Sequence, residues 1–109
     1  IKKETIFCER VKNKFVLRRD FKIKKNSNVL IVEDVITTGK SSLECSELVL
    51  KEGGNILGYA CIIDRSKGIS KIQKKIVSQL EINIPTYSKD NLPDSLLKIE
   101  ATKPGSRGI

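Results

Sequence analysis

Histidine is absent from this chain of 109 residues, and its three cysteines stand far apart, at positions 8, 45 and 61. No two cysteines have the spacing of a metal-binding pair, so the sequence does not indicate a Cys/His metal site. Cys45 lies in a helical pattern and Cys61 in an apolar run. This placement favours a role for both as small core residues in a reducing compartment.

Aromatic residues and long apolar runs are also scarce. The aromatic side chains are Phe7, Phe15, Phe21, Tyr59 and Tyr87. They are too few and too scattered for a platform that stacks single-stranded bases. The longest apolar stretch, 56–63, is too short to cross a bilayer, and the N-terminus shows no signal peptide. We therefore expect neither a membrane nor a nucleic acid as a partner, and we expect a cytoplasmic location.

Positive charge is what the sequence has in excess. It contains 21 Lys and Arg residues against 13 Asp and Glu residues, a formal net charge of +8. This balance suits an anionic ligand such as phosphate or pyrophosphate, although a solvated surface explains any single lysine equally well. The length allows one domain or part of one. The chain begins with Ile1 rather than Met, so we expect a piece of a longer protein.

The most informative run is 29–42. Its first four residues are apolar and predict a buried strand of a parallel sheet. Glu33 and Asp34 follow, and a Thr/Gly/Ser turn then leads into a helix-like stretch. Ligands of open α/β sheets bind at the carboxyl ends of strands. The carboxylates can accept hydrogen bonds from neighbouring hydroxyls, and the turn and helix N-terminus suit a phosphate. The run therefore indicates a sugar phosphate as ligand.

The surrounding pattern predicts the α/β class. Residues 41–51 have helical spacing, Gly53 and Gly54 end that helix, and 55–63 form a second buried strand that closes at Asp64 and Arg65. A strand, a helix and a strand in this order predict a parallel pair. The other expected elements are a strand at 4–10, a hairpin or mobile loop at 11–28, a loop at 66–70, an edge strand at 76–84, a short helix at 91–98 with Pro93 near its first turn, and a loose basic tail at 102–109.

The run at 29–42 resembles one family signature and excludes another. A Walker A loop needs a glycine five residues before Gly39, where Asp34 would repel a polyphosphate. The run is instead similar to the phosphoribosyl-diphosphate (PRPP) signature of type I phosphoribosyltransferases. Glu33 and Asp34 fill its two acid positions, Thr37 its variable position, and Thr38–Ser41 its Thr/Ser-Gly-x-Ser/Thr end. The alternative is a chance acid pair, but a core strand gains nothing from two buried carboxylates.

The resemblance implies a fold and a ligand. The fold is α/β, a type I phosphoribosyltransferase core with a parallel sheet flanked by helices. Residues 1–109 would be the C-terminal portion of a single domain whose N-terminal part, with a hood over the base, is missing. The implied PRPP-binding residues are Glu33, Asp34, Val35, Ile36, Thr37, Thr38, Gly39, Lys40 and Ser41. The acids would hold the ribose hydroxyls and favour an oxocarbenium-like transition state. Mg²⁺ is the implied cofactor, held mainly through PRPP, with no protein ligand assigned.

Thr37 and Arg65 point to orotate as the base. Hypoxanthine-guanine members typically have Asp at the variable position and adenine members Ala, whereas Thr37 resembles the orotate members. Arg65 matches an arginine that contacts the substrate in orotate phosphoribosyltransferases, where it could pair with the orotate carboxylate. A salt bridge with Asp64 is the alternative role for Arg65. The resemblance thus implies formation of orotidine 5-phosphate in pyrimidine biosynthesis, with this piece alone inactive. A purine or xanthine phosphoribosyltransferase and an RNA-binding regulator on the same fold remain alternatives.

The resemblance also covers the basic stretch and the end of the chain. Residues 7–10, 15–21 and 91–107 are similar to one bacterial branch of orotate phosphoribosyltransferases, which usually has Gly at the position of Asp20. Family members are homodimers whose mobile basic loop reaches a neighbouring active site. That loop would lie within 11–21, where Lys14, Arg18 and Arg19 are candidate catalytic residues.

Overall fold

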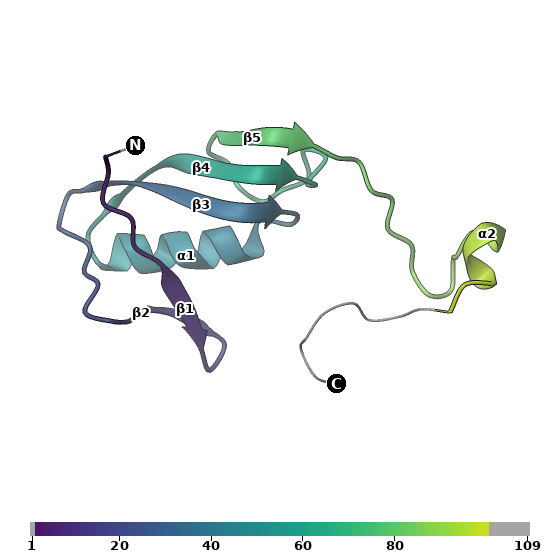
Figure 1. The fold of residues 1–109 in the computed structure, drawn as a ribbon, viewed down its shortest axis with the longest axis horizontal. Helices are drawn as coiled ribbons and strands as arrows, with labels where there is room; N and C mark the ends of the chain where they lie inside the picture. The colour runs from purple at the N-terminus through teal and green to yellow at the C-terminus, as the bar shows by residue number, and fades with distance from the viewer. Residues whose placement is uncertain (1, 101–109) are drawn as a thin grey trace.

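A parallel three-stranded sheet with one helix against it is the centre of the structure, a computed structural model that describes residues 2–100. Strand β3 (Asn28–Ile36), helix α1 (Lys40–Lys51) and strand β4 (Asn55–Asp64) form the predicted strand-helix-strand unit. Strand β5 (Ile76–Glu81) pairs with β4, also in parallel, so the strand order is β3-β4-β5. Figure 1 shows α1 lying along one face of this sheet.

The two faces of the sheet differ in burial because successive side chains of a strand point to opposite sides. The face toward α1 carries the core. The core residues are Ile31, Ile36, Val49, Ile56, Tyr59, Cys61 and Ile72. The opposite face is apolar as well but more than half exposed at Leu30, Val32, Leu57, Ile62 and Val77. The strands therefore have the composition of a sheet that is buried on both faces.

Strand β3 is longer than the sequence predicts. The expectation that it ends at Val32 is wrong, because its parallel ladder with β4 continues to the pair Ile36 and Asp64. Glu33 and Asp34 consequently lie inside the strand, not beyond it. Strand β5 ends at Glu81, earlier than expected, and Ile82 only donates its amide to the Asp64 carbonyl, at 2.9 Å.

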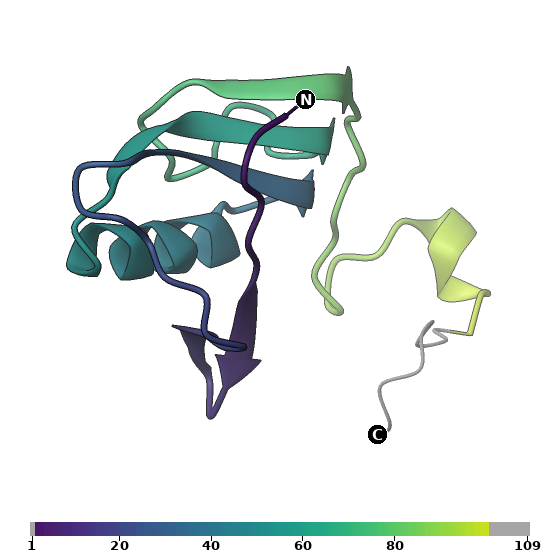
Figure 2. The same cartoon turned by 60° about the vertical axis from the view of Figure 1, so that its left-hand side comes forward.

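The basic stretch forms a hairpin, one of the two structures expected for it. Strand β1 (Cys8–Val11) pairs antiparallel with β2 (Lys14–Leu17) across a two-residue turn at Lys12 and Asn13. Both turn residues have positive φ angles, 46° and 63°, as the tightest hairpins require. Figures 1 and 2 show the hairpin on the α1 side of the sheet, extending away from it. The strand expected at 4–10 is limited to β1, since residues 2–7 have no strand partner.

After β5 the chain runs away from the sheet (Figure 1). The loop expected at 66–70 is present, and 71–75 forms no regular element. Helix α2 (Asp94–Leu97) is the short helix expected there, with Pro93 as its N-cap residue. No helix among the described residues is long and apolar enough to span a membrane. The tail predicted at 102–109 lies outside the described residues.

Candidate functional site

The turn between β3 and α1 is built around Gly39. Its φ angle of +75° favours glycine, and a Cβ atom there would lie 2.7 Å from Ser70 Oγ and 2.8 Å from Ile72 Cγ1. The Lys71 amide donates to the Thr38 carbonyl at 3.3 Å. Residues 70–72 therefore pack against the turn and restrict its backbone conformation.

The first turn of α1 leaves backbone amides available at this turn. Gly39 is the N-cap residue, and no side chain caps the helix. The Lys40 amide has one long contact, 3.4 Å, to Thr38 Oγ1. Thr37, Thr38, Lys40 and Ser41 are all exposed around these amides. Unpaired amides and the positive end of the helix dipole together favour an anion.

The two acids of the signature leave β3 in different directions. Adjacent residues of a strand point to opposite faces, and the half-buried Glu33 lies on the α1 face, where its Oε1 accepts a hydrogen bond from Ser42 Oγ at 3.4 Å. Asp34 is exposed, and its Oδ1 accepts the Val35 amide at 2.7 Å. This contact turns the Asp34 carboxylate toward the carboxyl end of the strand.

Ser42 is a residue that the sequence analysis missed. It is 2% exposed and links Glu33 to a buried polar chain, in which Ser46 Oγ donates to the Ser42 carbonyl at 2.8 Å and contacts Tyr59 Oη at 2.6 Å. Burial raises the pKa of Glu33, the Ser42 hydroxyl lowers it, and the Asp34 charge raises it. The signal available beforehand was a pair of serines on the face of α1 that turns toward the core.

Arg65 lies beside the turn, as the register of the two strands predicts. Its amide donates to the Ile36 carbonyl at 2.8 Å, which places it next to Thr37 at the same sheet edge. Among the described residues it forms no salt bridge with Asp64, whose Oδ1 instead accepts the Ser66 amide at 2.7 Å. The Arg65 Nε atom is buried and has no hydrogen-bond partner among residues 2–100.

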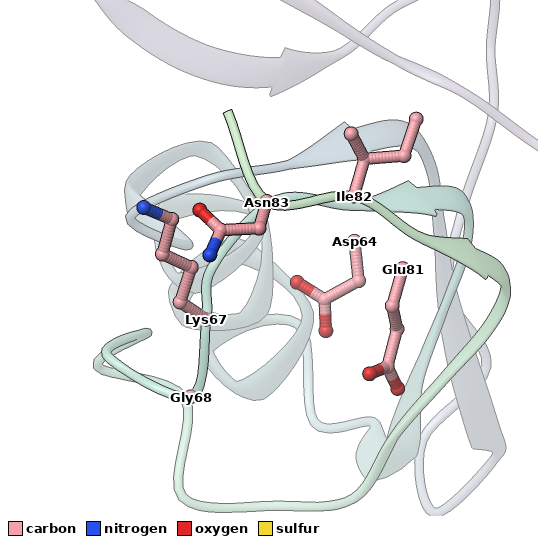
Figure 3. Close-up of a pocket in the computed structure, with 6 residues that line it drawn as sticks. All are labelled: Asp64, Lys67, Gly68, Glu81, Ile82 and Asn83. Carbon is pink, nitrogen blue, oxygen red and sulfur yellow. The ribbon is translucent and has the colours of Figure 1, made fainter. Parts of the chain in front are cut away.

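A shallow pocket of about 460 Å³ opens where β4 and β5 end. Figure 3 shows its lining, which is Asp64, Lys67, Gly68, Glu81, Ile82 and Asn83. Asp64 and Glu81 face each other in the strand register. Two carboxylates against one ammonium group make this pocket unsuited to an anionic base. Within residues 2–100, no three His, Cys, Asp or Glu side chains are grouped as a metal site.

The family model of the phosphoribosyl transferase domain matches residues 3–92. The chain belongs to this phosphoribosyltransferase family. The match includes the hairpin, β3, the turn and α1, so the elements around the predicted PRPP signature are those of a phosphoribosyltransferase.

Two curated relatives of the chain carry the same name. The chain is 45% identical over 109 residues to a protein of Parvibaculum lavamentivorans named orotate phosphoribosyltransferase, covering 100% of this chain and 56% of the relative. A protein of Maricaulis maris with the same name is 41% identical over 95% of this chain and 54% of its own length. The chain thus spans about half the length of the curated relatives it matches.

Solved phosphoribosyltransferase structures support the fold. Adenine phosphoribosyltransferase from Saccharomyces cerevisiae, in complex with adenine and an imino-altritol bisphosphate, is 30% identical. The match covers 71% of this chain and 46% of that structure, with a TM-score of 0.52. The likeness confirms the α/β phosphoribosyltransferase core predicted from the sequence.

Among the basic candidates, Lys14 begins strand β2 of the hairpin, and Arg18 and Arg19 directly follow that strand. Arg18 Nη1 pairs with Glu9 Oε2 at 2.7 Å, and Arg19 Nε lies 3.6 Å from Glu9 Oε1. Lys14 is exposed beside the hairpin turn. Asp20 has a φ angle of +61°, a conformation that glycine adopts without strain. This conformation gives a physical reason for the glycine that the similar branch usually has there.

Proposed function

We propose that the protein to which this chain belongs is an orotate phosphoribosyltransferase, which joins orotate to PRPP and releases orotidine 5-phosphate and pyrophosphate. The names of the relatives at 41–45% identity support this activity. The single observation that carries the choice of base is the position of Arg65 beside Thr37, with no carboxylate paired to its guanidinium among residues 2–100. A planar guanidinium without a carboxylate partner suits an anionic base, because it can bind a carboxylate through two parallel hydrogen bonds.

PRPP would lie across the carboxyl end of β3 in this proposal. The 5-phosphate would accept hydrogen bonds from the amides and hydroxyls of residues 37–41, at the N-terminus of α1. Glu33 and Asp34, with the backbone of Val35 and Ile36 between them and the turn, would hold the ribose. As the bond from C1 to pyrophosphate breaks, positive charge grows on the ribose, and two nearby carboxylates stabilise it.

The leaving pyrophosphate would need cations. The candidates in this chain are Lys14, Arg18 and Arg19 on the hairpin, of which the two arginines would have to leave Glu9 to reach it. Mg²⁺ would neutralise part of the charge on the pyrophosphate and orient PRPP. Magnesium is commonly held by one or two carboxylates together with substrate phosphates. Of the two acids, the exposed Asp34 fits this donor set, with Mg²⁺ held mainly through PRPP.

The proposal also covers the pathway, the cellular location and the oligomeric state. We place the reaction in pyrimidine biosynthesis in the cytoplasm, and we expect a homodimer in which the hairpin of one subunit serves the site of the other. The hairpin extends away from the sheet (Figures 1 and 2), and Lys14, Arg18 and Arg19 are exposed, which supports this arrangement.

The alternative activity is phosphoribosyl transfer to a purine, the reaction named for the similar yeast adenine phosphoribosyltransferase. Base competition separates the two. The protein containing this chain is assayed for PRPP consumption with orotate, adenine, hypoxanthine, xanthine and uracil, each with Mg²⁺. Orotate should be the preferred base in kcat/KM. A preference for any of the others would refute the assignment of orotate.

A further inference from the structure

Two cysteines bring the hairpin into contact with α1. The Sγ atoms of Cys8, in β1, and Cys45, in α1, lie 3.5 Å apart although 37 positions separate them in the sequence. Both thiols are free and half-buried. A disulfide has a sulfur–sulfur distance of about 2.05 Å, so bond formation requires the two sulfur atoms to approach by only about 1.5 Å.

A second pair of side chains aligns the same two elements. Arg10 forms a salt bridge with Glu44, one residue before Cys45 in α1. Arg10 lies on the same side of β1 as Cys8, because residues two apart in a strand share a face. The Arg10 guanidinium also lies 4.4 Å from the centre of the Phe15 ring of β2. The sulfur contact and the salt bridge therefore both join the hairpin to α1.

The chemistry of the pair assigns an order to its two sulfurs. Burial, the Cys8 thiol and the Glu33 charge together raise the pKa of Cys45 to about 12, so its thiolate is rare at neutral pH. Cys8 is then the sulfur that reacts first with an external oxidant. Cys45 lies 3.5 Å away, in position to attack the product.

We propose that Cys8 and Cys45 are a thiol modification site, at which a small-molecule disulfide of the glutathione class converts them to a reversible disulfide that tethers the basic hairpin to α1. In the first step the Cys8 thiolate attacks the external disulfide, forms a mixed disulfide and releases one thiolate. In the second step Cys45 loses its proton and attacks Cys8 Sγ, releasing the second thiolate. Two protein thiols are oxidised and one external disulfide is reduced to two thiols.

Peptide mapping tests the bond directly. The protein containing this chain is incubated with oxidised glutathione, alkylated and digested with trypsin, which places Cys8 in peptide 4–10 and Cys45 in peptide 41–51. We expect the two peptides to be recovered as one linked species that dithiothreitol separates. The Cys45→Ser variant should instead hold glutathione on Cys8. If that variant takes up glutathione while the wild type yields no linked species, the proposed bond does not form.

Variants of neighbouring residues test the geometry. Cys61→Ser, the matched control, should leave the linked species unchanged. Glu44→Gln removes the salt bridge that seats the hairpin and should lower the yield of linked species about two- to fivefold at a fixed ratio of glutathione to its disulfide. Native cleavage by trypsin after Lys12 and Lys14 should be several-fold slower in the oxidised protein, and reduction should restore it. Equal cleavage rates in both states would refute the tether.

Discussion

At the scale of single residues, Glu33 and Asp34 are the most informative pair. They share one strand yet have different surroundings, because Glu33 turns toward Ser42 and the helix while Asp34 is exposed. A structural role would make at least one of them necessary for stability. A role in binding ribose would make both necessary for turnover instead.

The first prediction concerns these two carboxylates. Glu33→Gln and Asp34→Asn keep the shape of each side chain but remove the charge that would face the ribose. Each loses a charge-assisted hydrogen bond worth about 1.5–3 kcal/mol, so kcat/KM for PRPP should fall about 10- to 150-fold. Steady-state kinetics measures the change. Glu52→Gln, an exposed carboxyl at the C-cap of α1, is the control and should keep full activity.

The second prediction separates the two substrates at Arg65. Lysine keeps the positive charge but not the planar pair of donors. Arg65→Lys should therefore weaken orotate binding by about tenfold or more while PRPP binding stays within about twofold. Separate titrations of orotate and PRPP into the variant measure both affinities. An equal loss for the two ligands would indicate that Arg65 only packs the turn.

The third prediction uses the raised pKa of Glu33. A carboxyl whose pKa is higher in the folded state than its ordinary value, 4.5, binds its proton more tightly when folded. The contribution of Glu33 to the free energy of unfolding is then largest below that value and falls as the pH rises through the raised pKa. Glu33→Gln should remove this fall. Urea denaturation from about pH 4 to pH 7 should thus give a flatter stability profile for the variant than for the wild type.

At the scale of elements, α1 serves two purposes. Its core face packs on the sheet through Val49, and its first turn faces the predicted phosphate site. The polar chain of Ser42, Ser46 and Tyr59 runs between these regions. Because buried polar groups must be paired, this chain fixes how the helix sits on β4.

The fourth prediction tests that chain. Tyr59 is 4% exposed and its hydroxyl lies 2.6 Å from Ser46 Oγ. Tyr59→Phe removes one buried hydrogen bond and should lower the free energy of unfolding by about 1 kcal/mol. Tyr87→Phe, at a tyrosine that is 47% exposed, is the matched control and should have almost no effect. Equal effects of the two substitutions would mean that the Tyr59 hydroxyl is not part of the buried chain.

At the scale of the whole molecule, the uncovered face of the sheet is the dominant feature. Leu30, Val32 and Ile62 are all more than half exposed on it, opposite α1. Exposed apolar side chains on one face of a sheet favour association with other surfaces. The chain also spans only about half of its curated relatives. That residues 1–109 are part of a larger domain stays a prediction, which these two observations motivate.

The fifth prediction follows from this surface. Residues 1–109 expressed alone should show no appreciable orotidine 5-phosphate formation and should aggregate, since the phosphate turn and Arg65 are present but the outer face of the sheet is bare. The rate is compared with that of the full-length protein at equal concentration, after gel filtration has established the soluble fraction. Turnover within about tenfold of the full-length protein would contradict this account of the domain.

Much of the fold was predictable from local patterns. The periodicity of 41–51, the apolar run at 55–63 and the glycines after the helix correctly predicted α1, β4 and the end of the helix, because burial and backbone conformation set these patterns residue by residue. The end of β3 was not predictable in this way. Its last residues form a strand because β4 lies beside them as far as Asp64, which is a property of the pairing and not of the segment.

The amino-acid sequence by itself determined the parallel strand-helix-strand unit, the signature from Glu33 to Ser41 and the family to which the chain belongs. Each depends on residue types at fixed spacing along one segment. Only the tertiary structure decided that Ser42 reaches Glu33, that Asp64 accepts the Ser66 amide and forms no salt bridge with Arg65 within the described part of the chain, and that Cys8 meets Cys45. These contacts join residues on different elements, and their distances depend on how the elements pack, which no local pattern encodes.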